Sequence, residues 1–236
     1  MSTLYLIRHG QASFGEKNYD RLSDIGHRQA KILGEHLLLF GQSFDAIYHG
    51  RLDRQRQTAE NVMACYEKSG RKMARPAVSE AFDEYNAFAV WKAYMPRLIK
   101  EEPSLESEME QIRADPKAFQ KIFGRIMFRW ISGKYDRDGE PRWADFKSRV
   151  TDGLYALMER HGSGSRIAVF TSGGPISVMV QRALDLSDEK TMELSWQVMN
   201  ASVTRMKYRD GNIALAGFND ISHLRMAGNE TLLTYR

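Results

Sequence analysis

The chain has 236 residues, of which 42% are hydrophobic and 27% are charged, and its net charge is +4. This length suits one α/β domain with a buried core, and the charged fraction argues against a wholly disordered chain. The lysines and arginines are spread along the sequence without a basic run, so we expect small anionic substrates and not nucleic acid as partners.

The sequence shows no sign of membrane insertion or secretion. The N-terminus lacks a basic segment followed by an apolar stretch, and no apolar run reaches about 18 residues. The single cysteine, Cys65, excludes an internal disulfide and favours a reducing compartment. We therefore expect a cytoplasmic protein that does not bind membranes.

The first predicted strand ends in three residues that suit phosphate chemistry. Residues 4–7 are all apolar, as in a strand covered on both faces, and ligands bind at the carboxyl ends of such strands. Arg8 offers a planar set of donors, His9 can be a nucleophile, and Gly10 allows close backbone approach. An isolated triplet of this kind is more often just the polar end of a core strand, so its meaning depends on the rest of the chain.

The next segment alternates loop, helix and strand. Residues 11–20 form a polar loop, in which Ser13 could offer a hydroxyl and Gly15 a backbone N–H to an anion, or both could only shape the turn. Ser23 is expected to cap a helix that runs to about Phe40. The strand–helix–strand order predicts that the following strand, residues 44–48, pairs in parallel with the first.

Arg54 follows this second strand at the start of the next helix. Helix N–H groups and a guanidinium together form an anion site, so Arg54 is a candidate phosphate ligand. Residues 77–79 form a weak third strand, and Glu84 follows it.

Four features in this order resemble the histidine phosphatase superfamily, also called the phosphoglycerate-mutase-like family. They are Arg8-His9-Gly10, Leu22-Ser23-x-x-Gly26-x-x-Gln29-Ala30, Leu52-x-Arg54-x-x-Gln57-Thr58-Ala59, and Glu84. The resemblance covers roughly residues 3–85 and 143–224. It implies an α/β three-layer sandwich, with a mostly parallel central sheet, helices on both faces and an inserted helical cap.

The resemblance also implies roles for four residues. His9 would attack phosphorus and carry a transient phosphohistidine. Arg8 and Arg54 would hold the phosphoryl oxygens and offset the charge that develops there. Glu84 would protonate the leaving alcohol, as a carboxyl kept protonated by its surroundings can do. No cofactor is implied.

Two neighbouring acids, Glu80 and Asp83, remain alternatives to Glu84. The spacing Phe82-x-Glu84 matches the family and favours Glu84. A metal site is not expected, because four further histidines lack ligand spacing and suit surface or capping roles: His27, His36, His49 and His161.

Residues 86–142 are expected to form the helical cap within a single domain spanning residues 1–236. The pattern predicts helices over 87–94, 104–112 and 116–130, the first ending at Pro96. Trp91 and Tyr94 are candidates for a substrate pocket, although packing between cap and core is the expected use of most of these aromatic residues.

The rest of the chain completes the sheet. A helix over 143–161, a strand over 166–170, a helix over 176–184 and a hairpin of two strands over 200–208 and 213–218 are expected.

The turn before the helix at 176 departs from the family, because Ser172 stands where the resemblance places a second histidine. A serine hydroxyl can still donate one hydrogen bond, but losing the imidazole would cost about 10²–10³ in rate. The residues expected to bind the phosphate are Gly10, Gln11, Ser13, Gly15, Ser172 and Gly173.

Three functions follow. The favoured one is a phosphomonoesterase acting on a small phosphorylated metabolite through His9; mutase activity is less favoured, because no Gly-x-Leu-x-Gly stretch follows Glu84. The alternative is a catalytically weakened member that binds a phosphorylated ligand or a protein. A serine hydrolase using Ser172, Asp220 and His223 is the least favoured, because it leaves the arginines unexplained. The sequence predicts neither the natural substrate nor the oligomeric state.

Overall fold

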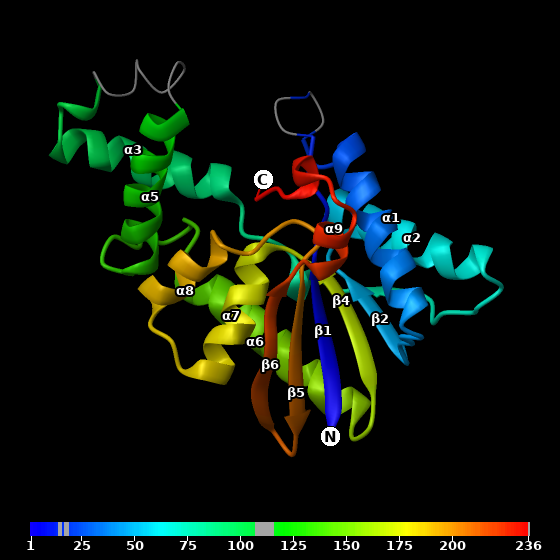
Figure 1. Cartoon of the computed structure of the whole chain (residues 1–236). Coiled ribbons are helices and arrows are strands. Elements are labelled where there is room, and N and C mark those ends of the chain that lie inside the picture. Colours follow the sequence, from blue (N-terminus) through cyan, green and yellow to red (C-terminus); the bar gives the residue numbers. More distant parts are fainter. Residues whose placement is uncertain (14–15, 17–18, 107–115, 236) are drawn as a thin grey trace.

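A six-stranded sheet in the order β3-β2-β4-β1-β5-β6 forms the centre of the computed structural model, which describes residues 1–13, 16, 19–106 and 116–235 (Figure 1). Parallel pairing joins β1 to β4, β4 to β2 and β2 to β3, whereas β5 pairs antiparallel with both β1 and β6. The expected mostly parallel α/β sheet is therefore confirmed. Its strands are β1 (Ser2–Arg8), β2 (Ala46–His49), β3 (Pro76–Val78), β4 (Arg166–Thr171), β5 (Val203–Arg209) and β6 (Asn212–Asp220).

One detail of the strand pairing differs from expectation. Strand β2 runs parallel to β1 but does not pair with it, because β4 lies between them. All residues of β4 after Arg166 are buried, so this strand takes an interior place that covers both of its faces.

Helices cover both faces of the sheet, which confirms the three-layer arrangement (Figure 1). Helices α1 (Asp24–Leu39) and α2 (Asp53–Lys68) bury one apolar cluster against Ile7 and Phe170. Helices α6 (Trp143–His161) and α7 (Gly173–Leu184) bury the other against Leu4 and Leu6. The Ser23 side chain accepts a bond from the Gly26 N–H, so its predicted role as the α1 cap is confirmed.

Helices α3 (Ala87–Glu101) and α5 (Pro116–Ile131) stand to one side of the sheet, close to α8 (Asp188–Ser195) (Figure 1). The prediction that the first of them ends at Pro96 is wrong. Proline removes one helical hydrogen bond, but burial of Tyr94, Met95 and Leu98 on one face carries the helix on to Glu101. The helix expected over 104–112 lies largely outside the described residues.

Helices α3 and α5 share one apolar cluster with the helices that cover one face of the sheet. Ile122 and Trp130 of α5 belong to the same buried group as Val150 of α6 and Met192 of α8. Helix α8 has no counterpart among the predicted elements, and neither has α9 (Ser222–Met226). The interpretation of residues 86–142 as an insertion within one domain stays a prediction. The described residues also form two short 3₁₀ turns, η1 (Glu80–Phe82) and η2 (Glu230–Leu232).

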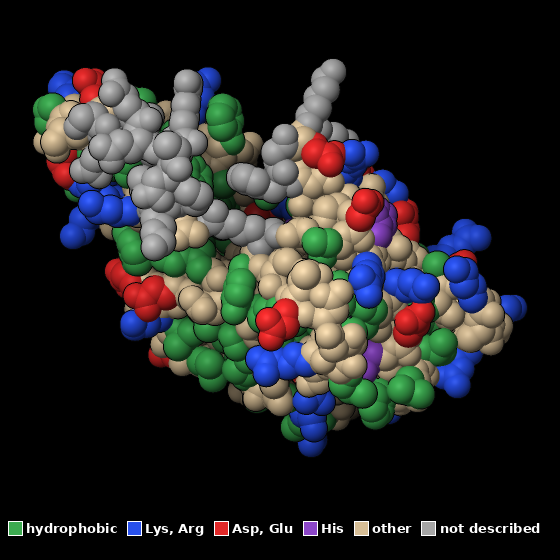
Figure 2. All heavy atoms as spheres, turned by 45° about the horizontal axis from the view of Figure 1, so that its top comes forward, with side chains coloured by type: hydrophobic (Ala, Val, Ile, Leu, Met, Phe, Trp, Pro, Cys, Tyr) green, Lys and Arg blue, Asp and Glu red, His purple; other side chains and the backbone are tan. Residues whose placement is uncertain are grey.

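The surface carries mixed charge. On the face seen in Figure 2, lysine and arginine side chains are scattered among acidic and apolar ones. Within the described residues, no helix combines the length and the apolar character needed to span a bilayer.

Candidate active site

His9 follows β1 directly, at the carboxyl end of an interior strand. Its backbone N–H donates to the Thr171 carbonyl at 2.9 Å. Its carbonyl accepts bonds from the Asn200 side-chain amide at 3.1 Å and from the Ala201 N–H at 3.2 Å. The segment between α8 and β5 and the end of β4 therefore fix the position of His9.

The contacts of the imidazole define its tautomer. Nδ1 lies 2.7 Å from the Gly10 carbonyl oxygen, which can only accept, so Nδ1 carries the proton and Nε2 keeps its lone pair. The Arg54 Nε–H donates to Nε2 at 3.1 Å. Burial of the ring, followed by the charges of Arg54 and Arg8, holds the pKa of His9 well below its ordinary value. The side chain is therefore a neutral imidazole, and its Nε2 lone pair accepts the bond from Arg54 in this structure.

Gly10 is required by a close backbone crossing. A Cβ at Gly10 would lie 2.5 Å from the Gly26 carbonyl oxygen, and one at Gly26 would lie 2.1 Å from the Gln11 oxygen. The Gly10 N–H donates to the Thr58 hydroxyl at 3.0 Å. The first turn of α1 and the second turn of α2 thus both hold the loop that follows His9.

Arg54 is buried in the first turn of α2, where its guanidinium pairs with the carboxylate of Asp20. Its Nη1 is 2.5 Å from Asp20 Oδ1, while Asp20 Oδ2 accepts the N–H of Asp53 at 2.9 Å. The Asp20 carboxylate therefore binds both the Arg54 guanidinium and the N-terminus of α2. These two groups together stabilise a bound anion.

Arg8 binds backbone carbonyls in this structure. Its guanidinium donates to the carbonyl of Val198 and, at 2.8 Å, to that of Tyr235. Burial lowers its pKa to about 10, so it stays charged at neutral pH, and its charge acts on His9 and on Glu84. Arg8 thus places a positive charge beside the imidazole.

Glu84 lies against the N-terminus of α7. Its Oε2 accepts the Gly174 N–H and its Oε1 the Tyr85 N–H, each at 3.1 Å. A Cβ at Gly174 would lie only 2.1 Å from Oε1, so glycine is needed for the carboxyl to reach this place. Burial raises the pKa of Glu84, although the bond from Gly174 and the charges of Arg54 and Arg8 oppose the rise. A carboxyl protonated more readily than usual is suited to proton donation.

The two alternative acids are engaged elsewhere. Asp83 accepts the backbone N–H and the Nε–H of Arg51, both at 2.6 Å, and Glu80 pairs with the same guanidinium at 2.9 Å. Both carboxylates are therefore held by Arg51, which leaves Glu84 as the acid whose environment favours the protonated form.

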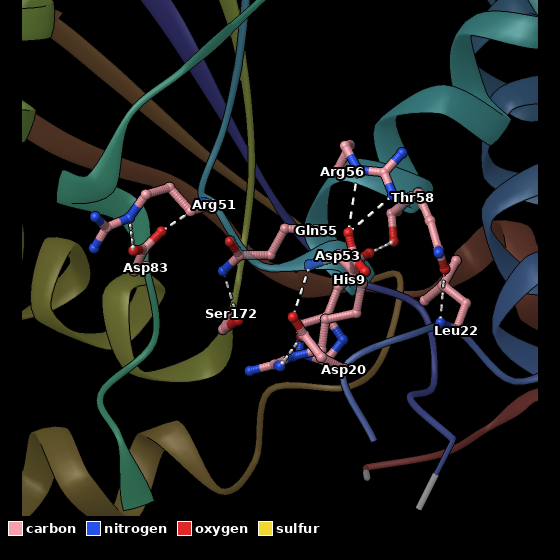
Figure 3. A network of polar contacts seen from close by, with 12 residues as sticks. His9, Asp20, Leu22, Arg51, Asp53, Gln55, Arg56, Thr58, Asp83 and Ser172 are labelled. Carbon is pink, nitrogen blue, oxygen red and sulfur yellow. Dashed lines mark hydrogen bonds and ion pairs between the residues drawn. The ribbon is translucent and has the colours of Figure 1, made fainter. Parts of the chain in front are cut away.

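Ser172 follows β4, where the resemblance expects a second histidine. The β1–β4 register pairs Arg8 with Thr171, so Ser172 is level with His9 at the same edge of the sheet. Ser172 is buried, and its Oγ accepts a bond of 2.8 Å from the Gln55 side-chain amide (Figure 3).

The remaining predicted phosphate contacts are only partly placed at the site. Gly173 begins α7, beside the Gly174 N–H that donates to Glu84. The hydrogen bonds of Gln11 go to residues of α1 and its cap, because its N–H donates to Gln29 and its side-chain oxygen accepts from the Ser23 hydroxyl. The Ser13 hydroxyl donates to the Leu22 carbonyl at 3.0 Å. Gly15 lies outside the described residues.

The serine-hydrolase arrangement is not formed among the described residues. The Ser172 hydroxyl meets Gln55, and the ring of His223 lies against that of His36, with 5.6 Å between centroids. Asp220 accepts bonds from Ser222.

The two aromatic pocket candidates serve packing. Trp91 stacks on Phe119 at 5.6 Å and on Phe123 at 6.5 Å between centroids. Tyr94 is 1% exposed and donates to Asp136 at 2.8 Å.

Three residues of the site were not predicted. Asp20 gives no signal, because it lies in a loop without periodicity, and the sequence pattern predicts only a strand position for Asn200. Gln55 carried a readable signal: it shares a helical face with Ala59 and Val62, where a polar side chain needs a buried partner. Within the described residues, no group of three or more His, Cys, Asp or Glu side chains is placed to hold a metal ion.

Similarity to curated proteins is local. A 2,3-bisphosphoglycerate-dependent phosphoglycerate mutase of Bartonella henselae is 34% identical over 85 residues, which are 33% of this chain and 41% of the relative. The mutase of Brucella anthropi is 33% identical over 79 residues, or 31% and 38% of the two chains. The chain thus matches about two fifths of the length of these relatives.

Solved structures share the fold over nearly the whole chain. A mutant phosphoserine phosphatase of Entamoeba histolytica in complex with phosphoserine has a TM-score of 0.64 and 20% identity, covering 95% of this chain and 100% of its own. A phosphoglycerate mutase of Bacillus anthracis has a TM-score of 0.62 and 20% identity, covering 97% of each chain.

The family assignment rests on the sequence as a whole. Residues 4–221 match the sequence profile of the histidine phosphatase superfamily, branch 1, and the residues that face one another at the carboxyl ends of β1 and β4 lie within that match. The chain belongs to the histidine phosphatase superfamily.

Proposed function

We propose that the protein is a phosphomonoesterase that hydrolyses a small phosphorylated metabolite through a phosphohistidine at His9. The observation that carries the proposal is the neutral His9 ring, whose Nδ1–H is held by Gly10 and whose Nε2 lone pair faces Arg54. A nucleophile with this lone pair needs no base to remove a proton before it attacks.

In the first step, the Nε2 lone pair forms a bond to phosphorus while the bond from phosphorus to the substrate oxygen breaks. The Glu84 carboxyl gives its proton to that oxygen, and the alcohol leaves. Arg54 and Arg8 supply positive charge for the phosphoryl oxygens. The Arg54 Nε–H must first turn away from His9 Nε2 to free its lone pair, and the guanidinium must leave Asp20 or share it.

In the second step, water attacks the phosphorus of the phosphohistidine. The Glu84 carboxylate takes a proton from that water, the bond between phosphorus and Nε2 breaks, and phosphate leaves. His9 is neutral again and Glu84 is protonated again, so the cycle closes without a cofactor. A reducing, cytoplasmic setting suits a chain with one cysteine.

A panel of small phosphate esters, assayed for phosphate release by the unmodified protein and by His9→Ala, tests the proposal. We expect hydrolysis of at least one ester by the unmodified protein and none above background by the variant. Equal rates for the two proteins would refute the role of His9.

A weakened, ligand-binding member of the family is the second candidate, and Ser172 favours it. Its test is to restore an imidazole. The Gln55 amide lies 2.8 Å from Ser172 Oγ, so Ser172→His needs the space that Gln55→Ala provides. A large gain in turnover by the double variant would support a weakened site, and no gain over an already active protein would exclude it.

A further inference from the structure

Gln55 and Ser172 form a buried pair that the mechanism above does not use. Gln55 is 0% exposed and Ser172 1% exposed. The Gln55 Nε2 donates to Ser172 Oγ at 2.8 Å and to the Phe82 carbonyl at 3.1 Å. The orientation of the amide follows from the second contact, because a carbonyl oxygen can only accept and must face the NH₂ group.

This geometry constrains the hydroxyl proton of Ser172. Since Oγ accepts the Gln55 N–H, its own proton has to point away from Gln55, and among the described residues it has no acceptor. Ser172 is level with His9 across the β1–β4 pair, at the edge of the sheet where the imidazole lies. The proton is therefore available to a group bound beside His9.

We infer that Gln55 is a positioning residue that holds the Ser172 hydroxyl so that it donates to a phosphoryl oxygen. The inference rests on the proposed function, and it assigns to two neutral residues the hydrogen bond that an imidazole would otherwise supply. Ser172 touches the phosphoryl group, and Gln55 acts through Ser172.

The surroundings are built for this arrangement. A Cβ at Gly50 would lie 2.0 Å from Gln55 Oε1, so glycine makes room for the amide. The Phe82 carbonyl also accepts the Thr171 hydroxyl at 2.6 Å. Removing the Gln55 amide therefore leaves Phe82 with a partner, which makes the perturbation specific to Ser172.

A double-mutant cycle tests the pair. Gln55→Met, Ser172→Ala and the double variant are compared with the unmodified protein by the rate of His9 phosphorylation in single turnovers with p-nitrophenyl phosphate. We expect each single variant to lose about tenfold in this rate, and the double variant to lose about tenfold as well. A loss of about a hundredfold in the double variant would mean independent roles and would overturn the inference.

Matched controls separate positioning from packing. Gln181 is a buried glutamine whose Nε2 also donates to two acceptors, the Leu186 carbonyl and Asp188. Ser177 is a buried serine farther along α7. Gln181→Met and Ser177→Ala should leave the rate within about twofold, and thermal unfolding of every variant shows whether it folds.

A charge-switching variant gives a second readout. In Gln55→Glu, the introduced carboxylate can only accept, so it draws the Ser172 proton away from the phosphoryl group. Once protonated, the same carboxyl donates as the amide does. We expect the activity of Gln55→Glu, relative to the unmodified protein at each pH, to rise as pH falls; a constant ratio would contradict the positioning role.

The same cycle on the dissociation constant of inorganic phosphate, measured by calorimetry, requires no turnover. Coupled losses in phosphate affinity, in a protein that forms no phosphohistidine, would support the positioning of Ser172 by Gln55 and contradict the proposed catalysis. A phosphohistidine in the unmodified protein, with additive losses in both the phosphorylation rate and the phosphate affinity, would support the catalysis and contradict the positioning role of Gln55.

Discussion

Under the proposed function, a phosphoryl group would have to displace Asp20 from Arg54, so Asp20→Asn should tighten phosphate binding. The carboxylate lies 2.5 Å from Nη1 of Arg54 and also accepts the Asp53 N–H at 2.9 Å. Asparagine has the same length and keeps an oxygen for the Asp53 N–H, but it removes the negative charge that a phosphoryl group must displace.

The exposure of the two side chains sets the magnitude. The Asp20 side chain is 36% exposed and that of Arg54 is 10% exposed, so the pair lies between a surface ion pair and a buried one. Surface pairs contribute about 0.2–1 kcal/mol and hydrogen bonds to charged groups about 1.5–3 kcal/mol. A value of about 1–2 kcal/mol for displacing Asp20 predicts a gain of about 5- to 30-fold in phosphate affinity.

Calorimetric titration with inorganic phosphate, in an otherwise unmodified protein, measures this gain. Asp53→Asn is the matched control, because it removes a neighbouring charge that pairs with Arg56 on the surface. The control should change the affinity by less than about twofold. Unchanged or weaker phosphate binding by Asp20→Asn would refute the reasoning and would mean that Asp20 holds Arg54 in place.

Three further predictions concern the proposed acid Glu84, the neighbouring Gly174, and the dependence of stability on the pKa of His223. Glu84→Gln should lower kcat on an alkyl phosphate by about 10²–10³ but much less on p-nitrophenyl phosphate, whose leaving group needs no proton; equal losses on both would contradict the role. Because the pKa of Glu84 is raised, kcat/KM on the alkyl ester should fall as pH rises through that pKa, and the variant should lack this limb. Gly174→Ala should cause a similar loss on the alkyl ester alone, because its Cβ would lie 2.1 Å from Glu84 Oε1 and displace the carboxyl. Equal losses of kcat on the two esters would contradict this prediction. Burial, aided by the charge of His36, lowers the pKa of His223 from 6.5 to about 4, so unfolding should become easier by roughly 3 kcal/mol as pH falls through this range. Urea denaturation at pH 7 and pH 4.5 should show this loss in the unmodified protein and a smaller one in His223→Gln.

The sheet edge that carries the site could be predicted because its signals are local. An apolar run ending in Arg8-His9-Gly10 marks a buried strand and its functional end in one stretch of sequence. The carboxyl ends of parallel strands share one edge of a sheet, so the residues after β1 and β4 were bound to meet there. The choice of Glu84 came from spacing, and the structure adds a reason, since Arg51 holds Asp83 and Glu80.

Other features depend on contacts that no local pattern contains. The position of β4 between β1 and β2 depends on which strand buries the most apolar surface inside the sheet, and that depends on the whole chain. The continuation of α3 through Pro96 follows from burial of its apolar face against the rest of the cluster. The pairing of Asp20 with Arg54 joins a loop to a helix, and a carboxylate in such a loop looks like any surface acid in the sequence.

The most direct test of the central claim is to trap the phosphorylated enzyme. A rapid quench during turnover, followed by peptide mapping in mass spectrometry, should find an acid-labile phosphoryl group on His9, attached at Nε2 because Nδ1 is held by Gly10. The group should be absent from His9→Ala. Hydrolysis that proceeds without this intermediate, or that persists in His9→Ala, would contradict the account.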